Sequence, residues 1–434
     1  MDYNLTIGNR NGSELVQKKV FNVVELFSGI GSQAEALKNI GAKINVINTC
    51  EWNLHAFLAY SLIHDMPGNT NDIRLSKKEI ITELLKLGIS NDGKEPVNET
   101  GLQSITEDAL KKIYASIIST KNLVDISKVK GKDLDGLIDI MTYSFPCQDL
   151  SNVGAFHGYK DGIDRNSGSR SGLLWEVERI LLERKKADMY LPHFLLMENV
   201  PALNNQRHRK NFIEWQTQLN NLGYYNKQYL LNAKDFGLPQ NRERLLMLSV
   251  FTDGDKDMEK AVDLFFKSHE IDPIAYKNTT EKKDIKLKDF LRTDYEEKKY
   301  YEEALECQPN ATVSRLKIWN ENIQLTDTNG KVKDIITATL TTKQDRHPNS
   351  GNLWIDFNNG KANFRYLTPR ECFLLMGFKE EDYEKVLDGN FELKKNNKVF
   401  TRDNLIKMAG NSIAVNVLEA IFLQVMELDN KLFI

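Results

Sequence analysis

A strand, a glycine turn and a helix follow one another near the start of the chain, and this order restricts the fold more than any other feature. Phe21–Phe27 is short, β-branched and aromatic, which predicts a strand. Ser28–Gly31 leads into Ser32–Ile40, a predicted helix, and Ile44–Ile47 is predicted as the next strand. A strand, a helix and a second strand in this order imply a parallel α/β sheet.

Further β-forming runs continue this pattern along the first part of the chain. They predict strands at Leu123–Ile126, Leu137–Tyr143, Phe194–Met197 and Leu245–Val250. Residues 76–122 interrupt the pattern as a helical insertion. Ser76–Glu79 forms a capping box for its first helix, which Gly88 can end, and Ser104–Glu107 opens its second helix.

The composition changes in the later part of the chain, which is polar and contains short possible strands such as Ile335–Leu340. We therefore expect a first domain of residues 1–260, completed by 405–434, and a smaller second domain over 261–404. Ala414–Met426 predicts an apolar helix that packs back on the first domain, with Ala409–Ser412 as its N-terminal cap. Residues 1–19 are predicted to be a loose polar arm.

Cysteine usage and charge exclude some classes of protein. The four cysteines, Cys50, Cys147, Cys307 and Cys372, are far apart, so neither a disulfide framework nor a metal site is expected. The net charge of −3 neither favours nor excludes a nucleic-acid partner. No apolar run reaches the roughly 18 residues of a membrane span. The N-terminus lacks the pattern of a signal peptide, so we expect a cytoplasmic protein with no membrane contact.

The turn after the first predicted strand has the composition of a cofactor-binding loop. Its glycines let the backbone pass close to a ligand at the carboxyl end of the sheet, within the segment Phe27, Gly29, Ile30 and Gly31. Glu51, just past the second strand, can accept hydrogen bonds from ribose hydroxyls, and Trp52 can cover an adenine face. Such a turn suits NAD, FAD or S-adenosylmethionine, or is only a tight turn. Ala34 replaces the third glycine of the dinucleotide pattern, which disfavours NAD.

Cys147 follows a predicted strand on a turn shaped by Pro146. Residues 149–172 come next, and this polar segment with five glycines fits a mobile lid better than packed structure. The alternative is a buried structural thiol. Two other polar groups occur at strand ends: Glu198 follows an apolar strand, and Gln240–Arg244 precedes another. Their alternatives are a surface carboxylate and a solvated charge cluster.

Taken together and in this order, these motifs resemble the DNA (cytosine-5)-methyltransferases, of the bacterial restriction–modification type. The resemblance assigns Phe27–Gly31 to the cofactor loop and Glu51-Trp52 to contacts with ribose and adenine. Asp125-Ile126 resembles the adenine-binding motif; Asp72 is a competing match, which its long separation from Cys147 disfavours.

The remaining motifs of the family occur further along the chain. Pro146–Gln148 resembles the catalytic motif, Glu198–Val200 the carboxylate motif and Gln240–Arg244 the arginine motif. Thr339-Leu340 is similar to a short signature near the end of the target-recognition region, and Arg365–Phe373 is similar to the motif that follows this region. Asn411 and Ser412 belong to the last motif, which returns to the cofactor pocket.

The resemblance implies a Rossmann-like, S-adenosylmethionine-dependent α/β domain with a mixed sheet, beside a smaller target-recognition domain. It implies that Cys147 adds to a flipped-out cytosine, that Glu198 binds its ring nitrogen, and that Arg244 with Arg242 binds its carbonyl oxygen. Methyl transfer to carbon 5 within a specific duplex sequence follows. The cofactor set includes Pro146, and the residues expected to contact DNA are Gln148, Ser151, Arg170, Thr339, Leu340 and Arg346.

The expected partner is double-stranded DNA, bound by a monomer, and a restriction–modification role implies a cognate endonuclease that need not touch this chain. Two rival functions share the fold: a tRNA cytosine-5 methyltransferase and a non-catalytic DNA-binding relative. The large region 261–404 disfavours the first, and the presence of Cys147, Glu198 and the arginines disfavours the second. An NAD oxidoreductase is a more distant alternative.

Overall fold

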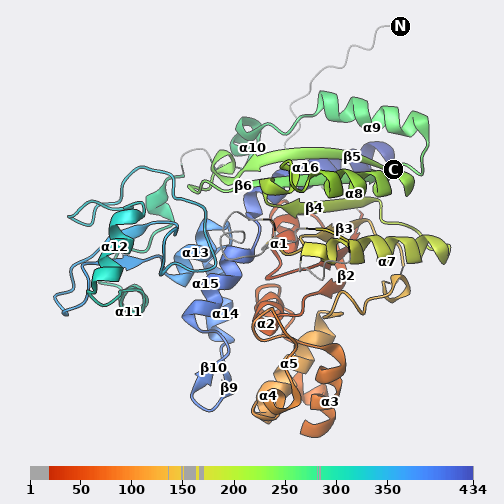
Figure 1. The fold of residues 1–434 in the computed structure, drawn as a ribbon. Coiled ribbons are helices and arrows are strands. Elements are labelled where there is room, and N and C mark those ends of the chain that lie inside the picture. Colours follow the sequence, from red (N-terminus) through yellow and green to blue (C-terminus); the bar gives the residue numbers. More distant parts are fainter. Residues whose placement is uncertain are drawn as a thin grey trace.

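A six-stranded sheet forms the centre of the computed structural model, which describes residues 19–134, 136–147, 150, 163–165, 171–280, 282 and 285–433. The strands are β1 (Phe21–Leu26), β2 (Ile44–Cys50), β3 (Ile140–Tyr143), β4 (Phe194–Asn199), β5 (Tyr224–Asn232) and β6 (Glu243–Phe251), in the order β2-β1-β3-β4-β6-β5. β1 is parallel to β2 and β3, and β3 to β4, whereas β6 is antiparallel to β4 and β5. The predicted α/β class and mixed sheet are confirmed (Figure 1).

Helices cover both faces of this sheet, and alternate residues of each strand pack into two separate cores. Val23 belongs to the core formed with α1 (Ser32–Asn39), α2 (Leu54–Ile63) and α16 (Val415–Leu432). Its neighbour Val24 belongs to the core formed with α7 (Leu174–Lys186) and α8 (Arg209–Asn221). This two-residue alternation is the pattern of a sheet buried on both faces.

The insertion folds as three helices beside α2: α3 (Lys77–Leu87), α4 (Glu99–Gln103) and α5 (Glu107–Ser119) (Figure 1). The capping box at Ser76 and the left-handed end at Gly88 are confirmed. The predicted start of the second helix at Ser104 is wrong. The hydroxyl of Ser104 donates to the carbonyl of Gly101 at the end of α4, and Thr106 caps α5 instead.

Two predicted strands are absent from the described residues. Leu123–Ile126 comes after α5 and lies beside the end of β2 without forming a strand, because Val124 has a positive φ of 63° and pairing with β2 is limited to the bridge between Asn122 and Thr49. A β-branched residue with positive φ interrupts a regular strand. Ile335–Leu340 makes one bridge, between Thr337 and Gln240, and forms no strand.

The region after β6 is made of short elements. α9 (Lys256–Ser268) and α10 (Pro273–Thr279) lie beside the sheet, while α11 (Lys298–Glu306) and α12 (Val313–Glu321) lie furthest from it (Figure 1). Two small hairpins and three helices complete this region: β7 (Asn352–Trp354) with β8 (Phe364–Tyr366), β9 (Glu392–Lys394) with β10 (Asn397–Lys398), α13 (Pro369–Leu375), α14 (Glu380–Asp388) and α15 (Arg402–Asn411). Single 3₁₀ turns occur at Thr70–Asp72, Gly131–Asp133, Ser171–Leu173, Pro201–Asn204, Ala233–Phe236 and Leu287–Asp289.

The predicted C-terminal apolar helix is confirmed as α16, but its predicted cap is wrong. Asn411 ends α15 and Ser412 is the C-terminal cap of that helix, whereas Ala414 precedes α16. By length and hydropathy the stretch Arg402–Leu432 could cross a membrane, yet 83% of its most apolar window is buried inside this protein. The core position of α16 accounts for its apolar composition.

Candidate active site

One cavity of about 1170 Å³ opens at the carboxyl ends of the parallel strands. Its lining comes mainly from the loops after β1, β2, β3 and β4, from residues 342–346 of the second region, which is the region after β6, and from α15 with the turn that follows it. Most of the residues that the sequence singled out lie in this lining, although they are distributed along most of the chain. Ligands in open α/β sheets bind at this edge.

The glycine turn after β1 is fixed by its surroundings. A side chain at Gly31, whose φ is +83°, would place its Cβ 2.1 Å from Nε2 of the partly buried His64, so glycine is favoured there. A Cβ at Gly29 would meet nothing within 4 Å, which leaves open space beside that backbone. The amide of Gly29 donates to Oε2 of Glu51 over 3.1 Å. Phe27, like both glycines, has a positive φ, which bends the chain sharply away from the strand.

Glu51 is held at the end of β2 with its carboxylate beside the cavity. Burial raises the pKa of Glu51, while backbone hydrogen bonds from Asn53 and Gly29 and the charge of Lys407 lower it. Asn122, which the sequence did not single out, fixes the backbone here. Its Oδ1 accepts from the amide of Glu51 at 2.9 Å, and its Nδ2 donates to the carbonyl of Glu51 at 2.9 Å.

Asp125 and Ile126 line the same cavity, with Trp52 and Cys50 nearby. Oδ1 of Asp125 accepts from the amide and the hydroxyl of Ser127, at 3.1 and 2.7 Å, which orients the carboxylate. Asp72 is exposed in a 3₁₀ turn and is not part of the lining. The geometry therefore favours Asp125 over Asp72.

Cys147 lies on the loop after β3, half-buried in the lining. Two side chains hold this loop: Nδ2 of Asn199 donates to the carbonyl of Phe145 over 3.0 Å, and the hydroxyl of Ser171 donates to the carbonyl of Pro146 over 2.6 Å. Burial raises the pKa of the Cys147 thiol, and the charge of Arg244 opposes this shift. Gln148, Ser151 and Arg170, with most of the predicted lid, lie outside the described residues.

Glu198 and Arg244 face each other across neighbouring antiparallel strands. Nε of Arg244 lies 3.1 Å from Oε1 of Glu198, and both side chains are mostly buried in the cavity lining. Burial raises the pKa of the Glu198 carboxyl, whereas Arg244 and then Arg242 lower it. Burial and the two arginines therefore act in opposite directions on this carboxyl, and burial is the larger effect.

Arg242 has a different environment from Arg244. Its guanidinium is buried and donates to the carbonyls of Leu340, Gly410 and Ser412, at 2.9, 3.1 and 2.7 Å. Burial, together with the charge of Arg244, lowers the pKa of Arg242 to about 9. The arginine therefore ties the second region and the turn after α15 to β6. The predicted contact of Arg242 with a substrate carbonyl oxygen has two N–H groups left, one on Nη1 and the one on Nε, and Nε has no partner in the described residues.

The residues of the second region that were expected to contact DNA differ in exposure. Leu340 is 1% exposed and its amide donates to Oε1 of Gln240 at 2.8 Å, so the prediction that its side chain contacts DNA is wrong. The hydroxyl of Thr339 donates to the carbonyl of Asn241 at 2.6 Å. Arg346 is exposed at the edge of the cavity and remains available to a ligand.

The last predicted motif lies beside the same cavity as the others. Asn411 and Ser412 are in the cavity lining, at the end of α15, together with Pro146 from the loop after β3. The lining also contains residues that the sequence did not single out. Among them are Asp92, Gly93 and Lys94 from the insertion and Lys407 from α15.

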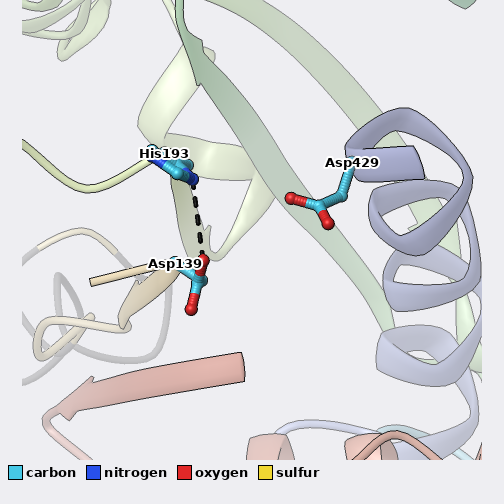
Figure 2. Close-up of side chains that lie close together, drawn as sticks. All are labelled: Asp139, His193 and Asp429. Carbon is cyan, nitrogen blue, oxygen red and sulfur yellow. Dashed lines mark ion pairs between the residues drawn. The ribbon is translucent and has the colours of Figure 1, made fainter. Parts of the chain in front are cut away.

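A group of possible metal ligands lies at the amino ends of the parallel strands. Among the described residues, Asp139, His193 and Asp429 bring their ligand atoms within 4.8 Å of one another (Figure 2). Nζ of Lys19 already lies 2.8 Å from Asp139 and 2.9 Å from Asp429. The lysine supplies the positive charge that these carboxylates require, and the group anchors the start of β1 to α16.

Comparison with known proteins identifies the sequence family. The profile described as C-5 cytosine-specific DNA methylase matches residues 85–427. The orphan methyltransferase M.SssI of Spiroplasma monobiae is 34% identical over 93% of this chain and 96% of its own length. The type II methyltransferase M2.ScrFI of Lactococcus lactis subsp. cremoris is 32% identical over 93% of this chain and 98% of its own length.

Solved structures share the fold at lower sequence identity. The Dnmt2 methyltransferase of S. pombe superposes with a TM-score of 0.56 at 19% identity, covering 94% of this chain and 99% of its own. A putative DNA modification methyltransferase encoded within an E. coli prophage gives a TM-score of 0.51 at 16% identity, covering 94% and 99% of the two chains. In both cases the similarity is one of fold and extends over nearly the whole chain.

Proposed function

Because the chain belongs to the C-5 cytosine-specific DNA methylase family, we propose that Cys147, Glu198 and Arg244 perform its reaction, which transfers a methyl group from S-adenosylmethionine to carbon 5 of cytosine in DNA. The observation that carries this assignment is the meeting of these side chains in one cavity with the glycine turn and Glu51. These residues are far apart in the sequence, and a reaction in which they all take part accounts for their meeting in one cavity.

The residues of the cavity fit S-adenosylmethionine. Gly29 leaves open space beside its backbone, Glu51 and Asp125 present carboxylate oxygens to hydroxyl and amino groups, and Trp52 offers a flat apolar face. We therefore assign Phe27–Gly31, Glu51, Trp52, Asp125, Ile126, Pro146, Asn411 and Ser412 to the cofactor. When bound, S-adenosylmethionine supplies an electrophilic methyl group to carbon 5.

Carbon 5 of cytosine is a poor nucleophile, and Cys147 changes this. After its thiol loses a proton to solvent, the sulfur forms a bond to carbon 6, and the electron pair of the C5=C6 bond moves to carbon 5. Once carbon 5 carries its new substituent, loss of the carbon-5 proton to solvent returns an electron pair, re-forms the double bond and expels the thiolate. The thiolate takes up a proton from solvent and becomes the thiol again, so the complete cycle releases one proton.

Glu198 and Arg244 stabilise the charge that this addition creates. A protonated or hydrogen-bonded Glu198 at ring nitrogen 3 withdraws electrons and favours attack at carbon 6, a contribution typically worth ~10²–10⁴-fold. Arg244, next to Glu198, binds the carbonyl oxygen of the base and stabilises its developing negative charge. The ion pair between the two holds both groups in place before the base arrives.

A cytosine paired inside a duplex cannot reach a mostly buried carboxylate and a half-buried thiol, so the target base flips out into this cavity. We propose that DNA lies between the sheet domain (residues 1–260 with 405–434) and a target-recognition domain (residues 261–404). Arg346 and Lys343 are exposed in residues 342–346, the part of the second region that lines the cavity, and are placed for contacts with DNA.

The cellular role is a further part of this proposal. A type II methyltransferase and an orphan methyltransferase are both among the relatives. We propose protection of host DNA in a restriction–modification system, by a cytoplasmic monomer whose cognate endonuclease need not contact it.

The test is methyl transfer by the purified protein, with tritiated S-adenosylmethionine, to plasmid DNA and to tRNA in parallel. We expect label in duplex DNA only, and bisulfite sequencing of the plasmid should place 5-methylcytosine in one recurring sequence. Label confined to tRNA would establish the rival substrate, and no label on either would support a non-catalytic relative.

A further inference from the structure

Part of the cavity lining comes from the helical insertion, which the family motifs do not include. Asp92, Gly93 and Lys94 form a turn between α3 and α4, and all three line the cavity with Glu51 and Trp52. The insertion therefore reaches the edge of the sheet where the cofactor residues lie.

The backbone fixes this turn against the segment that follows β2. The amide of Ser90 donates to the carbonyl of Trp52 at 2.7 Å, and the amide of Leu54 donates to the carbonyl of Ser90 at 2.8 Å. Within the turn, the Ser90 hydroxyl accepts from the amide of Gly93 at 3.0 Å, and Oδ1 of Asp92 accepts from the amide of Lys94 at 2.8 Å. These bonds make the turn a fixed continuation of the Glu51–Leu54 segment.

Lys407 of α15 joins this turn to Glu51. Its ammonium group donates to the carbonyl of Asp92, and its charge lowers the pKa of Glu51. A Cβ at Gly93 would lie 3.4 Å from Nδ2 of Asn53 and 3.8 Å from Nζ of Lys407, so the turn, the lysine and the β2 exit are in close contact.

We propose that the Asp92–Lys94 turn forms part of the site for the adenosyl half of the cofactor, and that Lys407 is a positioning residue that holds this turn beside Glu51. The inference rests on the proposed function, since it takes Glu51 and Trp52 as the ribose and adenine contacts. It gives the insertion a role in cofactor binding, whereas the family motifs give it none.

The charged groups around Glu51 determine what removal of Lys407 does. Asp92 and Lys94 face the cavity from the insertion, Asp125 from the segment after Asn122, and Lys407 from α15. Lys407 is the cation that lowers the pKa of Glu51. Its removal raises that pKa, so Glu51 becomes protonated, and a weaker acceptor for ribose hydroxyls, at a higher pH than in the wild type.

The experiment measures equilibrium binding of S-adenosylhomocysteine by calorimetry, without DNA, from pH 5 to 8.5. We expect Lys407→Met to bind ~10-fold more weakly at pH 7.5, the effect of losing one charged hydrogen bond. The pH at which binding is half lost should move upward in Lys407→Met and also in Lys407→Gln, which keeps a donor and loses the charge. The matched control is Lys395→Met, at an exposed lysine on the β9–β10 hairpin.

Gly93→Ala tests the turn without changing any charge. Its φ of +72° is unfavourable for alanine, so the turn must shift and affinity should fall, while the pH midpoint stays at the wild-type value. Wild-type affinity in either Lys407→Met or Gly93→Ala, or an unchanged pH midpoint in Lys407→Met, overturns the inference. Glu51→Gln distinguishes a failure of this inference from a failure of the proposed function. If the wild type binds S-adenosylhomocysteine and Glu51→Gln does not, the cofactor site at Glu51 is supported, whatever the result for Lys407→Met. No binding by the wild type would remove the proposed function itself.

Discussion

Nε of Arg244 lies 3.1 Å from Oε1 of Glu198, and this ion pair lines the same cavity as the thiol of Cys147. The two side chains are 16% and 12% exposed, so each compensates a charge that would be costly alone. β4 and β6, which carry them, are antiparallel neighbours, whereas Cys147 follows β3 on the other side of β4. The meeting of these three side chains therefore depends on the order of the central strands.

Cys147→Ser should abolish methyl transfer, with a loss of roughly 10³-fold or more, because a hydroxyl is a far weaker nucleophile than a thiolate. Binding of duplex DNA and of S-adenosylhomocysteine should persist. Tritium transfer to plasmid DNA and gel-shift binding measure the two properties. DNA carrying 5-fluorocytosine should trap wild-type protein covalently, since fluorine cannot leave as a proton, and should not trap the variant. Full activity in Cys147→Ser would exclude this residue as the nucleophile.

Glu198→Gln should lower the single-turnover rate by ~10²–10⁴-fold, because an amide cannot supply a proton to ring nitrogen 3. The side chain keeps its shape, so affinity for DNA and cofactor should change little. Glu183, on α7, is a suitable control: Glu183→Gln should retain the wild-type rate. A rate within threefold of the wild type in Glu198→Gln would contradict the assigned role.

Arg242→Met should destabilise the fold more than Arg244→Met does. The first change leaves the carbonyls of Leu340, Gly410 and Ser412 without their donor, and each unpaired buried group costs ~1–3 kcal/mol. Arg244→Met leaves Glu198 without its ion-pair partner. Burial raises the pKa of this carboxyl, so it can take up a proton and avoid an unpaired charge. Urea unfolding measures both, and a larger loss in Arg244→Met would refute the bracing role of Arg242.

Asp125→Ala should weaken binding of S-adenosylhomocysteine by ~10-fold or more, because the Asp125 carboxylate lines the cavity and would lose a charged hydrogen bond to the ligand. Asp72→Ala should leave binding unchanged, since Asp72 is exposed outside the lining. Calorimetry on both variants provides the comparison. The opposite result would show that the family motif is assigned to the wrong aspartate.

Ionisation of Glu25 should lower the free energy of unfolding as the pH rises from about 4.5 to about 7. Burial raises the pKa of this carboxyl to about 7 in the fold, from 4.5, against hydrogen bonds from Tyr60 and Ala34. The folded state therefore holds the proton more tightly, and this stabilisation is complete below about pH 4.5 and lost above about pH 7. Glu25→Gln should remove about 3 kcal/mol of this dependence. Urea unfolding at pH 5 and pH 8 would measure it, and equal slopes in both proteins would contradict the prediction.

The sequence predicted elements whose cause is local. The β-branched run of β1, the Ser76 capping box and the apolar residues of α16 each depend on neighbours in the chain, and all were found. The Leu123–Ile126 strand failed because Asn122 holds the main chain of Glu51 and Val124 in a turn. The Asn122 side chain takes this position beside β2, a strand that is far away in the sequence, and composition cannot reveal such a contact.

By itself, then, the sequence determined the α/β class and the types of reactive residue, because strand periodicity and motif order are properties of neighbouring residues. Tertiary structure alone decided what those residues do. It separated Arg242, which holds three carbonyls, from Arg244, which pairs with Glu198, although the two differ by two positions in one motif. It also buried Leu340 and brought the insertion to Glu51. The physical reason is that burial and charge pairing depend on which distant segments approach a side chain, and only packing determines that.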